Sequence, residues 1–545
     1  MTQSHLFLRL VPALVLWFAG CTTAHPHRIA KSMDLDEASS RPAISSVLDL
    51  GNAEVPTEGE VARTGMNKQA MVGELLYVLG KDFGRGPSVS VAGLPAVVLA
   101  RTENGGLLVR VPVGVPAGRQ NVVVSTSKGV SSHPFEFRRF AAVGSPGSTK
   151  LSLLEAPAFT EAASIELGAD PAAVAFSRTK PLLYVVTQTA PACLEKPAGA
   201  DCTPSLLTVD LTLADFPVVQ KQKLVSGYVL GFSVAQGLDR ALVATSGGLQ
   251  VVNLEYRTPI LHQKAAWTAK TPGKDVLEAL ISPDVKTAVA LLRTGNRLST
   301  FDVSVPDVPK EGPQVDLLPG EKAPLVRTMA FFATRVTQTL YIAAGDTPES
   351  LVVGWHPGQI LTTELISARD RTMEPELKIL SSFPLPQEKV TPTHLAVSLL
   401  GATEVEDTQR TEWTHFLYFS LVHGELMTLT QNPLSTPSGL QMGVDLIESL
   451  KTIGFLSRLD HKQNFKSFAS DPVVIGALAL AHHGKELLSV RCVPHTSKEP
   501  LEVSFECGLH VMNLHTGKGE FRPMGKLAKA QFVSPFTFGA VAVQD

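Results

Sequence analysis

Ala173-Val-Ala-Phe176, Leu182-Leu-Tyr-Val-Val186 and Leu206-Leu-Thr-Val-Asp-Leu211 are three short apolar segments in succession, and turn residues separate them. Short apolar runs that end at turn signals are typical of β-strands. The third segment returns along the chain as an apolar run that often ends at Asp or Asn. Its copies are Leu249–Leu254, Leu298–Val303, Leu351–Val353, Leu426–Thr430 and Leu509–Leu514.

The first segment recurs as well, and its copies divide the chain into repeats. Seven starts are found, and they are 48 to 81 residues apart. Repeats of about 50 residues with three or four short strands each predict a β-propeller, because each small sheet buries its two apolar faces only against its neighbours. The starts are centred on Phe176, Phe232, Leu280, Phe331, Val397, Leu478 and Val533.

The last repeat is incomplete, and this predicts how the ring closes. Residues 532–543 hold two strands before the chain stops, whereas Leu151–Leu154 and Ala163–Leu167 precede the first full repeat. A last blade built from both ends would leave few exposed strand edges. The sequence therefore predicts a seven-bladed β-propeller over residues 150–545, closed by strands from both termini of that region.

Two long intervals predict insertions in the ring, at residues 355–389 and 431–471. Within the second, Val444, Ile447, Leu450, Ile453 and Leu456 recur every three residues, which allows a helix. This helix is either packed over a propeller face or an arm that recruits a partner. Loops on a rigid scaffold are the usual place for function.

The N-terminal part of the folded chain has a different pattern. Between residues 71 and 142, short alternating strands are separated by glycine turns, as in Gly80-Lys-Asp-Phe83, Val89-Ser-Val-Ala-Gly93 and Val109-Arg-Val-Pro112. The order of these motifs resembles an IPT/TIG domain, which implies a small immunoglobulin-like β-sandwich. The whole chain is therefore expected to be all-β. Phe83 is expected to pack in the core beneath its turn.

The beginning of the chain has the features of an export signal. Arg9 precedes an uncharged run from Leu10 to Gly20, which is too short to span a bilayer and is typical of a signal peptide over residues 1–20. Phe18-Ala-Gly-Cys21 resembles the lipobox of bacterial lipoproteins, which implies acylation of Cys21 and, with Thr22 next, an outer-membrane location. The alternative is an ordinary signal with an incidental cysteine. Residues 21–70 are polar and are expected to form a disordered tether.

The other four cysteines form two local pairs. Cys193 and Cys202 bracket a loop rich in Pro and Ala, and Cys492 and Cys507 lie at the two ends of an expected hairpin. Disulfides in both pairs fit an oxidising compartment. The alternative is four free buried thiols.

Candidates for chemistry are few. No hydrolase, zinc-protease, phosphate-loop or dinucleotide motif occurs. Leu183-Tyr-Val-Val186 and Ile281-Ser-Pro-Asp284 resemble YVTN, lactonase-like and WD40-like propeller repeats, and lactonase-like enzymes hold a divalent cation in the channel. The first strands of this chain read as apolar, so the channel is expected to be apolar and no metal or cofactor is expected. His482-His483 would point to opposite faces of a strand, and the scattered candidates are His394, His415, His423 and His461.

These observations predict a binding protein of the cell envelope that is not an enzyme. The lipid on Cys21 would attach it to the outer membrane, and the propeller would bind an envelope or surface protein, with polysaccharide as a second ligand class. A formal charge of −3 without a basic run does not favour nucleic acid. The competing hypothesis is a lactonase-like hydrolase or lyase with a divalent cation in the channel.

Overall fold

A computed structural model of the 545-residue chain places most of the strands. It describes residues 40–51, 69–102, 105–144, 147–177, 179–235, 240–254, 261–265, 267–292, 297–305, 309–317, 326–333, 338–344, 359–366, 375–384, 392–397, 401–404, 411–421, 426–431, 474–481, 486–496, 503–513, 519–528 and 540–544. The described chain is all-β, with three short 3-10 turns as its helical elements.

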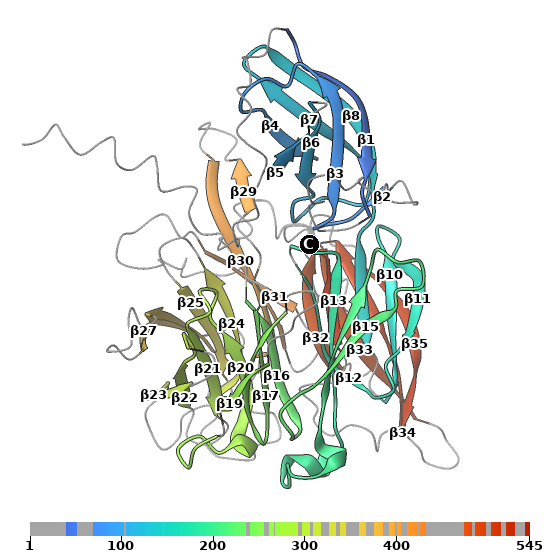
Figure 1. Ribbon diagram of the computed structural model, residues 1–545. Coiled ribbons are helices and arrows are strands. Elements are labelled where there is room, and N and C mark those ends of the chain that lie inside the picture. The colour runs from blue at the N-terminus through green and yellow to red at the C-terminus, as the bar shows by residue number, and fades with distance from the viewer. Residues whose placement is uncertain are drawn as a thin grey trace, which may run out of the picture.

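The first eight strands form an N-terminal unit, drawn in blue at the top of Figure 1. Its sheet is nearly closed, because β1 also contacts β8: the Ile44 N–H donates to the Ser131 hydroxyl over 3.0 Å, and Arg41, just before β1, donates from Nε to the Val130 carbonyl over 3.1 Å. The strands are β1 (Ala43–Asp49), β2 (Gln69–Ala70), β3 (Leu75–Lys81), β4 (Ser88–Val91), β5 (Leu94–Arg101), β6 (Leu107–Arg110), β7 (Gly118–Thr126) and β8 (Gly129–Phe137).

Strand β1 corrects the prediction that residues 21–70 are a disordered tether. It pairs with β3 from Ala43↔Lys81 to Asp49↔Leu76, and Val47 is buried in the unit's core. The polar composition around it concealed the short segment Ala43–Asp49, which has the edge of β3 to pair with. Phe83 is also in this core, 3% exposed, as predicted.

The remaining described strands form seven four-stranded sheets. In order along the chain, the first sheet holds β12 (Pro171–Phe176), β13 (Leu182–Thr187), β14 (Ser205–Asp210) and β15 (Val218–Lys223), and the second holds β16 (Val229–Val234), β17 (Arg240–Thr245), β18 (Gly248–Asn253) and β19 (Leu261–Ala265). The third holds β20 (Val276–Ile281), β21 (Thr287–Leu292), β22 (Arg297–Asp302) and β23 (Lys310–Asp316), and the fourth holds β24 (Val326–Ala333), β25 (Gln338–Ala344), β26 (Gln359–Ile366) and β27 (Glu376–Pro384). The fifth holds β28 (Pro392–Val397), β29 (Gly401–Glu404), β30 (Thr411–Leu421) and β31 (Leu426–Gln431), and the sixth holds β32 (Val474–Ala481), β33 (Glu486–Thr496), β34 (Val503–Asn513) and β35 (Gly519–Ala528).

The seventh sheet takes strands from both ends of this region. Its order is β11 (Thr160–Glu166), β10 (Lys150–Glu155), β9 (Phe140–Gly144) and β36 (Ala540–Val543), with β36 antiparallel to β9. The predicted split was two strands from each end, whereas three come from the front. The predicted sandwich, residues 71–142, included the first residues of β9, which belong to the propeller sheet instead.

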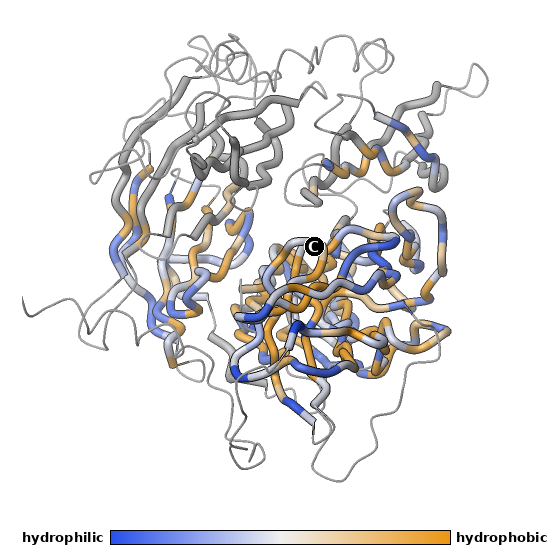
Figure 2. The backbone as a smooth tube through the Cα atoms, turned by 90° about the horizontal axis from the view of Figure 1, so that it is seen from above, coloured by the Kyte–Doolittle hydropathy of each residue, from blue (hydrophilic) through white to orange (hydrophobic). Residues whose placement is uncertain are grey.

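The sheets follow one another around a closed cycle. The first strands contact each other in the order β12, β16, β20, β24, β28, β32, β36 and back to β12. Seen from above, the described sheets lie around a ring (Figure 2). Such an arrangement of small radial sheets is a β-propeller.

Alternate residues of each second strand explain why the sheets stack. Leu183 and Val185 of β13 pack with Leu151 of the preceding sheet, whereas Tyr184 and Val186 pack with Val243 of the following one. Because successive strand residues point to opposite faces, an apolar run of this kind needs a sheet on each side.

One predicted insertion is wrong. Residues 355–389 include β26 and β27, which are the third and fourth strands of their sheet, with Leu340 of β25 opposite Thr363 of β26. The third strand of this repeat was predicted at Leu351–Val353, whereas the observed third strand, β26, begins at Gln359. The residues after Leu351 were therefore taken for an insertion. The other predicted insertion, residues 431–471, begins at the last residue of β31 and otherwise lies outside the described residues.

Candidate functional site

The two ends of the propeller differ, and the N-terminal unit lies at one of them (Figure 1). At that end, Arg110 of β6 donates from Nη1 to the carbonyls of Gly73, over 3.0 Å, and Thr179, over 2.7 Å. Thr179 belongs to the turn between β12 and β13. The connection from β14 to β15 also lies there, because its Phe216 packs with Met71 of the N-terminal unit. The turns at the other end of these strands therefore form a face that no described residue of the N-terminal unit covers, called here the uncovered face.

The uncovered face carries the longest described loop of the propeller, residues 188–204 between β13 and β14. It contains η2 (Pro191–Leu194) and η3 (Ala200–Cys202), and a disulfide joins Cys193 to Cys202 with a Cα–Cα distance of 5.4 Å. This pairing was predicted from the sequence and is confirmed. The bridge closes a small loop and so restricts its conformations.

This disulfide loop is bonded to the neighbouring sheet. The Ser246 hydroxyl donates to the Cys193 carbonyl over 2.6 Å, and the Gly227 N–H donates to the Cys202 carbonyl over 2.7 Å. Gln188 both donates to and accepts from the backbone of Val229, at 3.2 and 2.9 Å. The loop is thus held as a fixed part of the surface.

A second segment, residues 267–275, lies beside it. The Trp267 indole donates to the Thr245 carbonyl over 2.5 Å, and Thr271 bonds both Ser299 and Glu311 through its hydroxyl. The segment ends in η4 (Gly273–Asp275). Its Lys274 lies 3.7 Å from Glu195 of the disulfide loop, an exposed pair that contributes little stability but brings the two loops together. The exposed charges of this loop face are of both signs: Glu195, Lys196, Asp201, Lys270 and Lys274.

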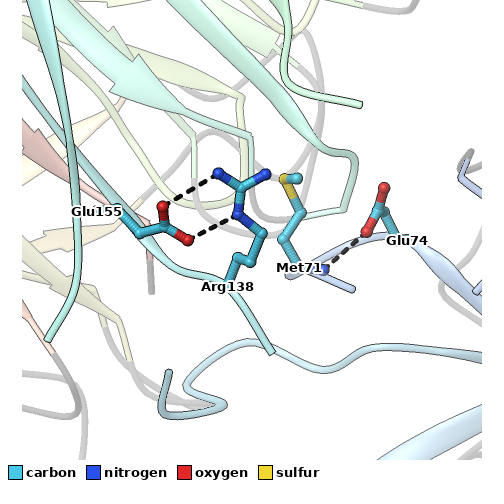
Figure 3. A network of polar contacts seen from close by, with 4 residues as sticks. All are labelled: Met71, Glu74, Arg138 and Glu155. Carbon is cyan, nitrogen blue, oxygen red and sulfur yellow. Dashed lines mark hydrogen bonds and ion pairs between the residues drawn. The ribbon is translucent and has the colours of Figure 1, made fainter. Parts of the chain in front are cut away.

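At the covered end, two residues connect the N-terminal unit to the propeller. Arg138 forms an ion pair with Glu155 of β10 through two hydrogen bonds, of 2.7 and 3.1 Å (Figure 3). Its guanidinium lies 4.8 Å from the centre of the Phe140 ring. Arg139 is nearly buried and pairs with Glu486 of β33 at 2.7 Å. Only Arg138 and Arg139 separate β8 of the N-terminal unit from β9 of the propeller, and both side chains form ion pairs with propeller residues. The two units are therefore held close together.

Two buried carboxyls lie at the same junction. Glu74 is 0% exposed and its Oε2 accepts from the Met71 N–H over 2.7 Å (Figure 3). Asp49, at the end of β1, is 3% exposed and its Oδ1 accepts from the Gly51 N–H over 2.8 Å. Burial raises the pKa of Asp49 to about 6. Burial, followed by the charge of Asp49, holds the pKa of Glu74 well above 4.5.

Inner strands use their polar side chains to join neighbouring sheets. Glu278 of β20 accepts from the Met329 N–H over 2.9 Å, and Ser233 of β16 accepts from the Ile281 N–H over 3.3 Å. The sequence prediction that the first strands are apolar missed Glu278, which lies within β20. Glu278 lies between Leu277 and Ala279-Leu280, so this stretch of sequence reads as an apolar strand.

Other predicted residues are distributed as follows. His394 and His415 lie in β28 and β30, opposite Ser420 and Gln431, and their side chains are outside the described set. Cys492 and Cys507 are direct cross-strand partners in β33 and β34, again without described side chains. In the described parts of the chain, no three His, Cys, Asp or Glu residues come together as metal ligands. Cys21, His423, His461, His482 and His483 lie outside the described residues.

The Asp residues that follow strands in the sequence accept turn hydrogen bonds where the structure describes them. Asp210 and Asp302 end β14 and β22, and each accepts a backbone N–H two residues on, at 2.9 Å in both cases. Asp284 accepts from the Lys286 N–H over 3.1 Å. These carboxylates shape turns, as expected for short polar side chains after a strand.

The fold and the two faces define the class of this chain, an all-β protein with a β-propeller. No protein-family model matches the chain, and no curated protein matches its sequence. Its solved structural neighbours include a functionally unknown protein from Desulfotomaculum acetoxidans, with 12% identity, TM-score 0.43, and coverage of 74% of this chain and 98% of that one. A periplasmic gluconolactonase from Pseudomonas aeruginosa has 10% identity, TM-score 0.42, and coverage of 75% and 99%. A protein from Lactobacillus plantarum has 12% identity, TM-score 0.41, and coverage of 75% and 100%.

These similarities assign no activity. Within the described ranges, no helix has the length and apolar character needed to cross a membrane.

Proposed function

We propose that this chain is a binding scaffold of the cell envelope, with an immunoglobulin-like N-terminal unit and a seven-bladed propeller. One observation carries the proposal: the N-terminal unit covers one end of the propeller, while a disulfide-closed, hydrogen-bonded loop is held at the other. A face that is ordered before it binds loses little conformational entropy on binding. Its partner is an envelope or surface protein that docks on this loop face.

The exposed charges suggest which residues to change. Lys196 and Lys274 lie on the two neighbouring loops of the face, and both are exposed. Reversing them, as Lys196→Glu with Lys274→Glu, is expected to lower partner recovery at least tenfold, because like charges across an interface are costly. Lys128 is an exposed residue of the N-terminal unit, and Lys128→Glu is the matched control.

The experiment is crosslinking and purification of the tagged protein from intact envelopes, followed by mass spectrometry of the partners. Partners that depend on the two loop lysines and not on Lys128 support the scaffold. Unchanged recovery in the loop variant would remove this face from the proposal. A stoichiometric divalent cation in purified protein, lost together with a hydrolase activity on chelation, would favour the lactonase-like alternative.

Attachment to the outer membrane through an acylated Cys21 is part of the same proposal, and it rests on the lipobox-like sequence. Cys21→Ala is expected to move the protein from the membrane to the soluble fraction, and intact-mass analysis of the mature N-terminus measures the acyl groups. An unacylated mature chain would refute the anchor.

A second disulfide, between Cys492 and Cys507, is proposed for the same oxidising compartment. Its support is the ladder of β33 and β34, in which the two residues lie directly opposite each other. Cross-strand partners are close enough for a bridge when their Cα atoms are about 4.5–5.5 Å apart. Peptide mapping without reduction is expected to find the crosslinked pair, and two alkylated thiols would contradict it.

A further inference from the structure

The junction between the N-terminal unit and the propeller contains two carboxyl groups that its folding removes from water. Asp49 and Glu74 each have one oxygen in a hydrogen bond. The second oxygen of each, Oδ2 of Asp49 and Oε1 of Glu74, is buried and has no hydrogen-bond partner among the described residues. A buried ionised carboxylate with an unmet acceptor is costly, whereas the protonated form carries no charge to desolvate.

The position of Glu74 ties the pair to docking, because Asp49 acts on Glu74 through its charge. Glu74 follows Gly73, which packs against the backbone of Lys180 in the propeller, and Met71 lies in a core shared with Phe140 and Phe216. Glu74 also senses the charge of Asp210 at the end of β14. Separating the two units would expose this turn and hydrate its carboxyl.

The charged groups around Glu74 do not offset its burial. From the N-terminal unit, Asp49 adds a like charge, and from the propeller Asp210 adds another. The positive charge of Arg138 slightly favours the ionised form of Glu74, but the Nε and Nη2 of Arg138 already bond to Glu155. Arg110 of β6 donates to the carbonyls of Gly73 and Thr179. The balance at the junction is therefore negative when both buried carboxyls are ionised.

We propose that docking of the N-terminal unit onto the propeller is linked to proton uptake at Asp49 and Glu74, so that the junction is tight in acid and loosens as the pH rises. The device would let the local pH of the envelope set how rigidly the two units are held. It does not depend on the identity of any partner.

The direction follows from the protonation of the two states. When undocked, the carboxyls return toward ordinary pKa values of 3.8 for Asp49 and 4.5 for Glu74. Docking raises the pKa of both, so the docked state holds more protons above these values. The contribution of both carboxyls to docking is complete below the ordinary pKa values and is lost as the pH rises, to about 6 for Asp49 and through the raised pKa of Glu74. Each linked proton changes the docking equilibrium about tenfold per pH unit.

Hydrogen exchange on the full chain measures this directly. The reporter is the peptide 69–75, which carries Gly73 at its contact with the Lys180 backbone of the propeller. After correction for the intrinsic exchange rate, protection in wild type is expected to fall as the pH rises above 4.5, by up to about tenfold per unit for each linked proton. Protection in β17 and β18, which lie away from the junction, is expected to stay constant.

Three variants separate the proposal from general instability. Glu74→Gln keeps an oxygen for the Met71 N–H and removes the charge, so protection of the junction is expected to become nearly independent of pH above 6. Asp49→Asn is expected to remove the part of the slope below about pH 6. Glu161→Gln, on the exposed side of β11, is the control and is expected to keep the full slope.

Two results at the junction itself would overturn the proposal: junction protection in wild type that does not change with pH, or a slope that persists in Glu74→Gln and Asp49→Asn. The first needs no variant, so a folding failure of Glu74→Gln leaves the test intact. A slope that appears equally in β17 and β18 would also overturn it, because the whole chain and not the junction would then be titrating.

Discussion

Substitution of Gly73 by alanine tests the contact between the two units at its closest point. Gly73 has a φ of +85°, and a Cβ built there would lie 2.6 Å from the Lys180 backbone nitrogen and 2.7 Å from its Cα. Real Cβ atoms do not approach backbone this closely, so either the turn or the propeller must move. Both effects of the substitution, conformational strain and steric overlap, act against docking.

The two contributions have separate magnitudes. An alanine in the left-handed region costs about 1–2 kcal/mol, and overpacking against backbone costs about 1–3 kcal/mol more. Gly93→Ala is the matched control, because Gly93 has a φ of +80° and an added Cβ there meets nothing within 4 Å. The expected difference between the variants is therefore the overlap term alone, about 1–3 kcal/mol.

The assay is the opening free energy of the peptides 69–75 and 179–187 by hydrogen exchange at pH 5, where the junction is expected to be tight. Gly73→Ala is expected to lower it in both peptides, and Gly93→Ala to leave the propeller peptide unchanged. Equal losses in the two variants, or a loss restricted to the N-terminal unit in Gly73→Ala, would refute the close approach of Gly73 to Lys180.

The other predictions concern the propeller. Tyr184→Phe removes a buried hydroxyl that donates to the Leu254 carbonyl over 2.9 Å, and is expected to cost about 1–3 kcal/mol in urea unfolding. Replacing Cys193 and Cys202 by serine is expected to lower stability by about 2–3 kcal/mol, measured as a lower Tm that matches the reduced wild type. Glu278→Gln is expected to keep the stability and Glu278→Ala to lose about 1–3 kcal/mol, because the side-chain oxygen accepts a buried N–H; equal losses would contradict this role.

Local patterns account for the part of the fold that the sequence predicted. The third-strand segments that begin at Leu206, Leu249 and Leu298 lie in β14, β18 and β22, and the segments from Leu426 and Leu509 lie in β31 and β34. Each is a short apolar run with its turn residue adjacent, so the information is contained in about ten residues. The Cys193–Cys202 bridge was predictable for the same reason, since a nine-residue separation constrains the pair by itself.

Long-range pairing explains what the sequence did not reveal. Ala43–Asp49 becomes β1 only because β3 offers an edge some 30 residues away, and Phe140–Gly144 becomes β9 only because Ala540–Val543 returns to it. Neither segment has a pattern of its own that is stronger than its surroundings. The buried state of Glu74 was likewise hidden, because it depends on a turn of the propeller that packs against Gly73.

Strand β9 belongs to the sheet that closes the propeller and also directly follows the N-terminal unit, so the two parts depend on each other. It begins two residues after β8 of the N-terminal unit, and it pairs with β10 on one side and β36 on the other. Phe140 at its start supplies a carbonyl to the Gln544 N–H over 2.8 Å and lies beneath the Arg138 guanidinium that binds Glu155. A change that loosens β36 therefore acts on the ring and on the anchor of the N-terminal unit together. Because the docking turn at Gly73 and the closing strand at Phe140 contribute to one core through Met71, a pH change at Glu74 would also reach the seam where the propeller closes.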